Sequence, residues 1–120
     1  MKRGTITIDG KRNVHIPSTP VWMSACEIAD LLGAFSGKVN AQIKEIFRED
    51  LLMEREAMRT IRSEQGFIDL YGIEMITMLS FHITTPQAKT LRRWIIDRLS
   101  GKNSSSSPLI VCYTLGKRYN

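Results

Sequence analysis

The sequence predicts one α+β domain of winged helix-turn-helix character, with an N-terminal β-hairpin and a helical C-terminal half. Three observations predict it. Two amphipathic segments meet at a glycine between Ser24 and Phe47, strand-like runs surround an Asp-Gly turn before them, and a second strand pair and two helical segments follow. A chain of 120 residues is long enough for one core. We expect the domain to span residues 1–100.

The N-terminal segment has the pattern of a β-hairpin. Threonine and isoleucine alternate over Thr5–Ile8, and Val14 and Ile16 alternate with polar residues in the next run. Asp9-Gly10 lies between the runs and is typical of a tight hairpin turn. We expect Trp22, which follows the hairpin, to be a hydrophobic anchor at the entrance to the next element.

The segment from Ser24 to Phe47 has the pattern of a helix-turn-helix. Ser24 and Glu27 have the spacing of a capping box, which marks the start of the first helix. Gly33 directly follows the last periodic apolar residue, where a left-handed cap favours glycine. Ser36 is then expected to cap the second helix. The inward face of that helix is predicted to contain Val39, Ile43, Ile46 and Phe47.

The outward face of the second helix carries side chains that suit nucleic acid. Its candidate DNA-binding residues are Ser36, Lys38, Asn40, Gln42 and Lys44. Asparagine and glutamine pair with adenine edges, and lysine reaches guanine acceptors or phosphate. The short turn would place the N-terminal half of this helix in a major groove. Two amphipathic helices around a glycine also build many small α domains that bind no DNA, so this alternative stays open.

A second hairpin is predicted after this motif. Ala57–Arg62 and Gly66–Tyr71 have the pattern of two strands around a polar turn. A hairpin at this position is called a wing, and Arg59 and Arg62 are candidates for phosphate or minor-groove contacts. A structural hairpin with solvated arginines is equally compatible with the pattern.

Two helices are predicted to close the domain. Ile73–Ile83 is apolar nearly all round and should be the most buried helix. Thr85-Pro86 has the form of a cap followed by proline at the first helical position, and opens a helix that ends near Leu99. Lys89 and Arg93 share its outer face, where they would hold a DNA backbone or keep the helix soluble. The predicted inward residues of this helix are Ala88, Leu91, Ile95 and Leu99, and Trp94 is also expected in the core.

Composition favours a polyanionic partner and gives no sign of catalysis. Seventeen Lys and Arg residues against twelve Asp and Glu residues give a net charge of +5. Cys26 and Cys112 lack CxxC spacing, so we expect no metal site. Neither a catalytic triad pattern nor a phosphate-binding loop occurs. We therefore expect a cytoplasmic protein that is not an enzyme, with no cofactor, no membrane contact and no small-molecule ligand.

Four runs of the sequence resemble the bacterial RhuM-type virulence proteins and related short mobile-element proteins. They are VWMSACEIADLLG, KVNAQIKEIF, DLYGIEMI and AKTLRRWIIDRL, and they cover Val21 to about Leu99. Gly72 departs from the pattern, where an asparagine is usual, and so does Leu91, where a phenylalanine is usual. The resemblance implies a DNA-binding domain that serves as a transcriptional regulator or accessory factor of a mobile element.

The expected function is therefore sequence-selective binding of double-stranded DNA. The alternative is a protein-interaction module, such as an antirepressor-like or scaffold subunit, that keeps the helix-turn-helix shape without using it on DNA. Residues 101–108 have the composition of a Ser-rich linker, and residues 109–120 of a C-terminal strand and basic tail. Such a strand would add to the N-terminal hairpin or pair with another copy, so a homodimer is possible.

Overall fold

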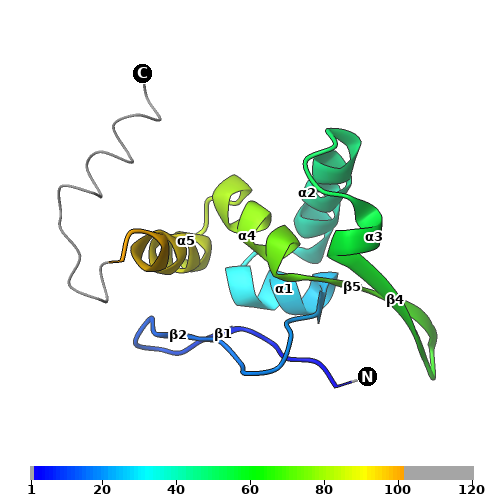
Figure 1. Cartoon of the computed structure of the whole chain (residues 1–120), viewed down its shortest axis with the longest axis horizontal. Coiled ribbons are helices and arrows are strands. Elements are labelled where there is room, and N and C mark those ends of the chain that lie inside the picture. The colour runs from blue at the N-terminus through cyan, green and yellow to red at the C-terminus, as the bar shows by residue number, and fades with distance from the viewer. Residues whose placement is uncertain (1, 102–120) are drawn as a thin grey trace.

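The chain forms a small, compact α+β domain, shown in Figure 1 as a computed structural model that describes residues 2–101. Within these residues it has five helices and two small antiparallel sheets. The strands are β1 Thr7–Ile8, β2 Val14–His15, β3 Met23–Ser24, β4 Met58–Ser63 and β5 Gly66–Tyr71. The helices are α1 Ala25–Leu32, α2 Ser36–Arg48, α3 Glu54–Ala57, α4 Ile73–His82 and α5 Pro86–Leu99. The predicted linker beyond Gly101 and the predicted C-terminal strand lie outside the described residues.

Helix α1 begins and ends where its caps predict. The Ser24 hydroxyl accepts a hydrogen bond from the Glu27 amide at 3.2 Å, and the Ser24 amide donates to the Glu27 carboxylate at 2.9 Å. This reciprocal capping box satisfies two backbone donors at the helix start. Gly33 adopts a left-handed conformation with φ 62°, which ends the helix. The start and end of α1 are therefore set by residues close to it in sequence.

Helix α2 has the predicted phase but not the predicted cap. Val39, Ile43 and Ile46 are at most 3% exposed, so the inward face is confirmed. The expectation that Ser36 caps the helix was wrong, because Phe35 is the N-cap residue and makes no side-chain cap hydrogen bond. Ser36 is instead the first helical residue and is exposed. The first turn is closed by a backbone hydrogen bond from the Val39 amide to the Phe35 carbonyl.

Both predicted hairpins form, and the second one gains a third strand. Strand β1 pairs with β2, with Ile8 opposite Val14. Strand β5 lies between β4 and β3 in an antiparallel sheet of order β3-β5-β4. Strand β3, only two residues long, was not predicted because it is too short for an alternating pattern. It joins the start of α1 to the hairpin β4–β5.

The helical C-terminal half is confirmed, although two details of its burial were wrong. In α4, Met75, Ile76 and Leu79 are fully buried, but Ile73 is 43% and Phe81 is 41% exposed. The expectation that α4 is the most buried helix was therefore wrong, since four of its ten residues are buried against four of eight in α1. In α5, Ala88 and Leu91 are buried as predicted and Ile95 is partly buried.

The outer end of α5 is less buried than its periodicity predicts. Leu99, predicted to face inward, is 84% exposed, and Trp94 is only partly buried. Leu99 is the last residue of α5, so the loss of burial falls at the C-terminal end of this helix.

One side chain joins the two halves of the domain. The Thr85 hydroxyl accepts a hydrogen bond from the Ala88 amide and so caps α5, as its sequence predicts. The same hydroxyl donates a hydrogen bond to the carbonyl of Leu32, the last residue of α1. The end of α1 and the start of α5 therefore share one polar group. Both helices also pack on the common apolar core.

Candidate nucleic-acid interface

The outward face of α2 presents polar side chains, most of them exposed. Ser36, Lys38, Asn40 and Lys44 are exposed, and Gln42 is half-buried. Neither lysine forms an ion pair with another residue of the range 2–101. Asn40 and Lys44 are four residues apart, as are Lys38 and Gln42, so the face carries two parallel rows of donors. The predicted orientation of this helix is confirmed.

One ion pair lies within α2. Arg48 in the last turn forms an ion pair with Glu45 of the same helix. Its hydrogen bond to Glu45 raises the pKa of the Arg48 guanidinium, and the same bond lowers the pKa of the Glu45 carboxyl. The positive charge of Lys38 and Lys44 is not neutralised in this way, so these lysines are the α2 cations that remain available to a ligand.

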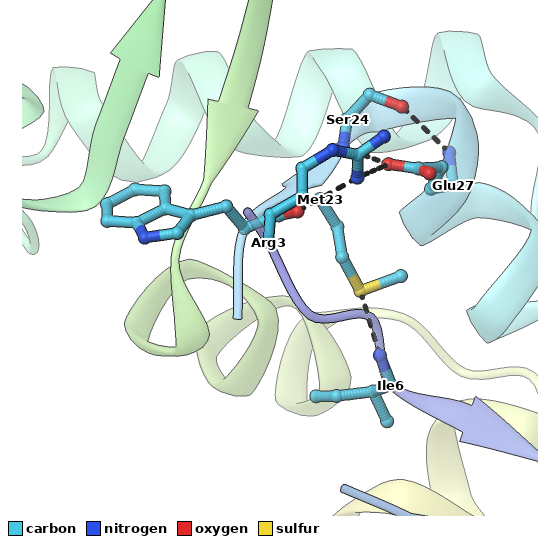
Figure 2. A network of polar contacts seen from close by, with 6 residues as sticks. Arg3, Ile6, Met23, Ser24 and Glu27 are labelled. Atoms are coloured by element: carbon cyan, nitrogen blue, oxygen red, sulfur yellow. Dashed lines mark hydrogen bonds and ion pairs between the residues drawn. The ribbon is translucent and has the colours of Figure 1, made fainter. Parts of the chain in front are cut away.

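The N-terminal segment contacts the start of α1, the helix that precedes α2 in the helix-turn-helix pair (Figure 2). The Arg3 guanidinium donates to the Trp22 carbonyl at 3.0 Å and to the Glu27 carboxylate at 2.6 Å. The amide of Ile6 donates to the sulfur of Met23 at 3.4 Å. Glu27 therefore serves both the capping box and an ion pair to a segment 24 residues away.

The Glu27–Arg3 contact should make stability depend on pH. Burial disfavours the charged carboxylate, but the hydrogen bonds from Arg3 and Ser24 outweigh it and hold the Glu27 pKa below its ordinary value of 4.5. A lowered folded-state pKa contributes stability above the unfolded-state value, and this contribution is lost as the pH falls through the folded-state value. Glu27→Gln keeps a capping side chain and should cost about 0.5 kcal/mol at neutral pH, because the pair is partly exposed.

Thermal unfolding measured from neutral pH down to about pH 3 checks this expectation. The parent protein and Glu27→Gln should converge as the pH falls below 4.5, since protonation removes the charge from Glu27. Glu64→Gln, in the exposed β4–β5 turn, is the matched control and should follow the parent throughout. A constant difference between Glu27→Gln and the parent at every pH would mean that the charge contributes nothing.

The hairpin β4–β5 places its two predicted arginines differently. The Arg59 guanidinium lies 4.5 Å from the centre of the Trp22 ring, a cation–π contact that occupies part of its surface. Arg62 is exposed and pairs across the strands with Phe67, which is 76% exposed. Arg62 is therefore the more available of the two. Trp22 is half-buried beneath Arg59, consistent with its predicted anchoring role.

Lys89 and Arg93 are exposed on α5, away from the other candidate residues. Helix α5 packs against α4 and α1, and Figure 1 shows α4 and α1 between α5 and the pair formed by α2 and the hairpin β4–β5. The structure thus distributes the nine predicted residues over three surfaces, on α2, on the hairpin β4–β5 and on α5. It does not gather them into one site.

Sequence reasoning missed one residue of the α5 surface, Arg12. Arg12 lies in the turn of the hairpin β1–β2, and it lines the same groove as Lys89 and Arg93. The turn is built around Asp9, whose carboxylate accepts hydrogen bonds from the amides of Asn13 and Lys11. The Asn13 amide and His15 are the main causes that lower the pKa of Asp9 to about 2. No sequence pattern signals that this turn directs Arg12 towards α5.

Protein-family models, curated proteins and solved structures give no match to this chain. The resemblance to RhuM-type proteins therefore remains a prediction. Within residues 2–101, no cluster of three or more potential metal ligands occurs. Over the same range, no helix combines the length and apolar character needed to cross a membrane.

Proposed function

We propose that this protein binds double-stranded DNA with sequence selectivity and acts without catalysis. The observation that carries the proposal is the outward face of α2, where Lys38, Asn40 and Lys44 are exposed on a helix whose opposite face is buried. A ligand that meets this face encounters two cations and an uncharged amide held on a rigid support. The amides of Asn40 and Gln42 match adenine edges, and the lysines match guanine acceptors or phosphate.

The chain topology supports the proposal. A strand, two helices, the short helix α3 and a hairpin follow one another as β3, α1, α2, α3 and β4–β5, and the sheet order is β3-β5-β4. This succession is compatible with a winged helix-turn-helix, in which α2 would enter the major groove and the hairpin would contact the flanking backbone. Arg62 is the hairpin cation best suited to that contact. A role as regulator or accessory factor of a mobile element rests on the sequence resemblance alone.

A second candidate function is a protein-interaction module, favoured by exposed aromatic side chains. Phe35, at the turn between α1 and α2, is 86% exposed, and Phe67 on the hairpin β4–β5 is 76% exposed. Exposed aromatic residues are common anchors in protein interfaces. On this alternative the α1–α2 pair would support a binding surface for another protein. DNA binding is preferred because the α2 face combines cations with amides, whereas these two phenylalanines belong to different elements.

Selection of bound fragments from random duplex DNA, followed by gel shifts at several salt concentrations, tests the proposal. The parent protein should enrich a defined sequence and bind it less tightly as salt increases. Lys38→Gln/Lys44→Gln should weaken binding and lower the salt slope by about 0.9 for each lost phosphate contact. Lys2→Gln/Lys11→Gln removes the same charge from the exposed N-terminal segment and should have a smaller effect.

Two results would count against DNA binding by α2. One is a parent protein that shifts no fragment at low salt. The other is an equal loss of affinity in the two double variants, which would mean that only net charge matters. A stable complex with another protein, abolished by Phe35→Ala while no DNA is shifted, would support the interaction module instead.

A further inference from the structure

Arg12 occupies a backbone position that normally suits glycine. The Arg12 amide donates to the Asp9 carbonyl at 3.0 Å, and the Asp9 amide donates to the Asn13 carbonyl at 3.0 Å. These bonds describe a three-residue hairpin loop in which Arg12 follows the turn with φ 65°. A left-handed conformation is strained for a residue with a long side chain. The neighbouring Gly10, which could adopt it freely, does not have a positive φ.

The side chain of Arg12 meets a basic groove between the hairpin β1–β2 and α5. The groove has a volume of about 660 Å³ and is also lined by Lys89, Arg93, Thr90 and Trp94. None of its three exposed cations, Arg12, Lys89 and Arg93, forms an ion pair with another residue between 2 and 101. A fourth lining cation, Arg92, donates to the Ser80 carbonyl at 3.1 Å, and Asp97 is the acidic residue of the lining.

Basic residues predominate in the lining of this groove, and acidic residues predominate in the lining of a neighbouring groove. An adjoining groove of about 610 Å³, which shares Arg12 and Thr90 with the basic groove, is lined by Asp9, Glu27 and Asp30, with Arg12 as its cation. A general excess of basic residues would not produce one acidic and one basic groove beside the same hairpin. The cations Lys89 and Arg93 lie about 6 Å apart along the α5 axis, given the rise of four helical residues. The basic groove therefore offers several positive charges to one extended anion.

We propose that this groove binds the phosphates of a nucleotide, with Arg12, Lys89 and Arg93 as the phosphate-binding side chains. The Thr90 hydroxyl donates to the Pro86 carbonyl at 3.0 Å, so its oxygen is left to accept a hydrogen bond from a donor group of the ligand outside the phosphates. Trp94 is partly buried, and the Arg98 guanidinium lies 4.7 Å from the centre of its ring. The part of Trp94 that lines the groove supplies aromatic surface beside the cations, where a nucleobase would lie. The ligand is either a free nucleotide or a nucleotide unit of a single strand. This site is separate from α2 and does not depend on duplex binding there.

Titration of the isotope-labelled full chain with ATP, and separately with a short single-stranded oligodeoxynucleotide, tests the site by NMR. The indole N–H signal of Trp94 and the amides of Lys89 and Thr90 should shift, whereas those of Lys38 and Asn40 should not. Arg12→Gly and Lys89→Gln should each weaken binding about tenfold, as expected for a lost charge-assisted contact. Because glycine relieves the left-handed backbone, Arg12→Gly should melt no lower than the parent protein.

Lys11→Gln is the matched control, since Lys11 is adjacent in the same turn, is exposed and does not line the groove. It should change the affinity by no more than about twofold. If ATP binds at least as tightly as the oligonucleotide, the ligand of the groove is a free nucleotide. If the oligonucleotide binds more tightly, the ligand is a nucleotide unit of a single strand. The proposal is overturned if neither ligand shifts the Trp94 signal, or if Lys11→Gln weakens binding as much as Arg12→Gly. Unchanged ATP binding by Lys38→Gln would show that this site is independent of α2.

Discussion

Ile76→Ala should lower the free energy of unfolding by about 2–5 kcal/mol, the usual range for a buried aliphatic residue. Ile76 is fully buried at the centre of α4, within the core cluster that also contains residues of α1, α2 and α5. The truncation removes three buried side-chain carbon atoms and leaves a cavity that the surrounding helices only partly refill. Urea unfolding followed by circular dichroism measures the change.

The same helix contains the control for this prediction. Ile73 is 43% exposed, so Ile73→Ala removes the same atoms from a position that faces solvent. It should cost less than about 1 kcal/mol. Similar losses in the two variants would contradict the burial pattern of α4. Both substitutions introduce alanine into a helix, so helix propensity does not separate them.

Asn40→Ala should selectively weaken binding to the preferred DNA sequence, by about 1–3 kcal/mol if the side chain reads an adenine. Asparagine carries no charge, so its loss leaves the contribution of counterion release to binding almost unchanged. The affinity for random duplex should therefore hardly change. Competition gel shifts with the selected sequence and with random duplex measure both affinities for one variant.

Arg62→Ala provides the comparison for Asn40→Ala. Arg62 is an exposed cation on the hairpin β4–β5, and we expect it to contact phosphate. Its loss should weaken binding to the selected duplex and to random duplex equally. It should also lower the slope of log affinity against log salt concentration by about the amount of one phosphate contact. If Asn40→Ala instead weakens binding to both duplexes equally, Asn40 of α2 does not recognise a base.

The elements that sequence predicts well are those whose boundaries depend on neighbouring residues. The capping box of Ser24 and Glu27, the left-handed Gly33, and Thr85 before Pro86 each act within a few residues and were all confirmed. Periodicity likewise predicted the buried face of α2. These signals need no knowledge of the remainder of the fold, because the interactions that they describe are local.

The errors arise where the result depends on what lies beside a residue in space. Periodicity places Leu99 on the same face as Leu91, but Leu99 is the last residue of α5 and is 84% exposed. Ile73 and Phe81 are apolar yet exposed, since a helix packs only on the faces where neighbours lie. Phe35 rather than Ser36 is the N-cap of α2, and it makes no side-chain cap hydrogen bond, so the serine that suits a cap in sequence does not act as one.

The candidate site was predicted only in part for the same reason. The α2 face follows from one helix, so Lys38, Asn40 and Lys44 were found exposed as expected. The α5 surface combines residues about 80 positions apart in sequence, and no local pattern connects Arg12 with Lys89 and Arg93. Arg12 also has a positive φ, which is uncommon for a residue other than glycine and which its sequence neighbours do not indicate.

The bond from Thr85 to the end of α1 has a consequence for how the domain unfolds. Leu32 and Thr85 are 53 residues apart, so this contact forms only when the N-terminal helices and the C-terminal helices are both in place. Separation of α5 would leave the Leu32 carbonyl without its donor and open the core that α1 and α5 share. Amide protons in α1, α2 and α5 should therefore exchange with solvent in one cooperative opening, with a common free energy, and the helix-turn-helix pair should not persist as an isolated fragment.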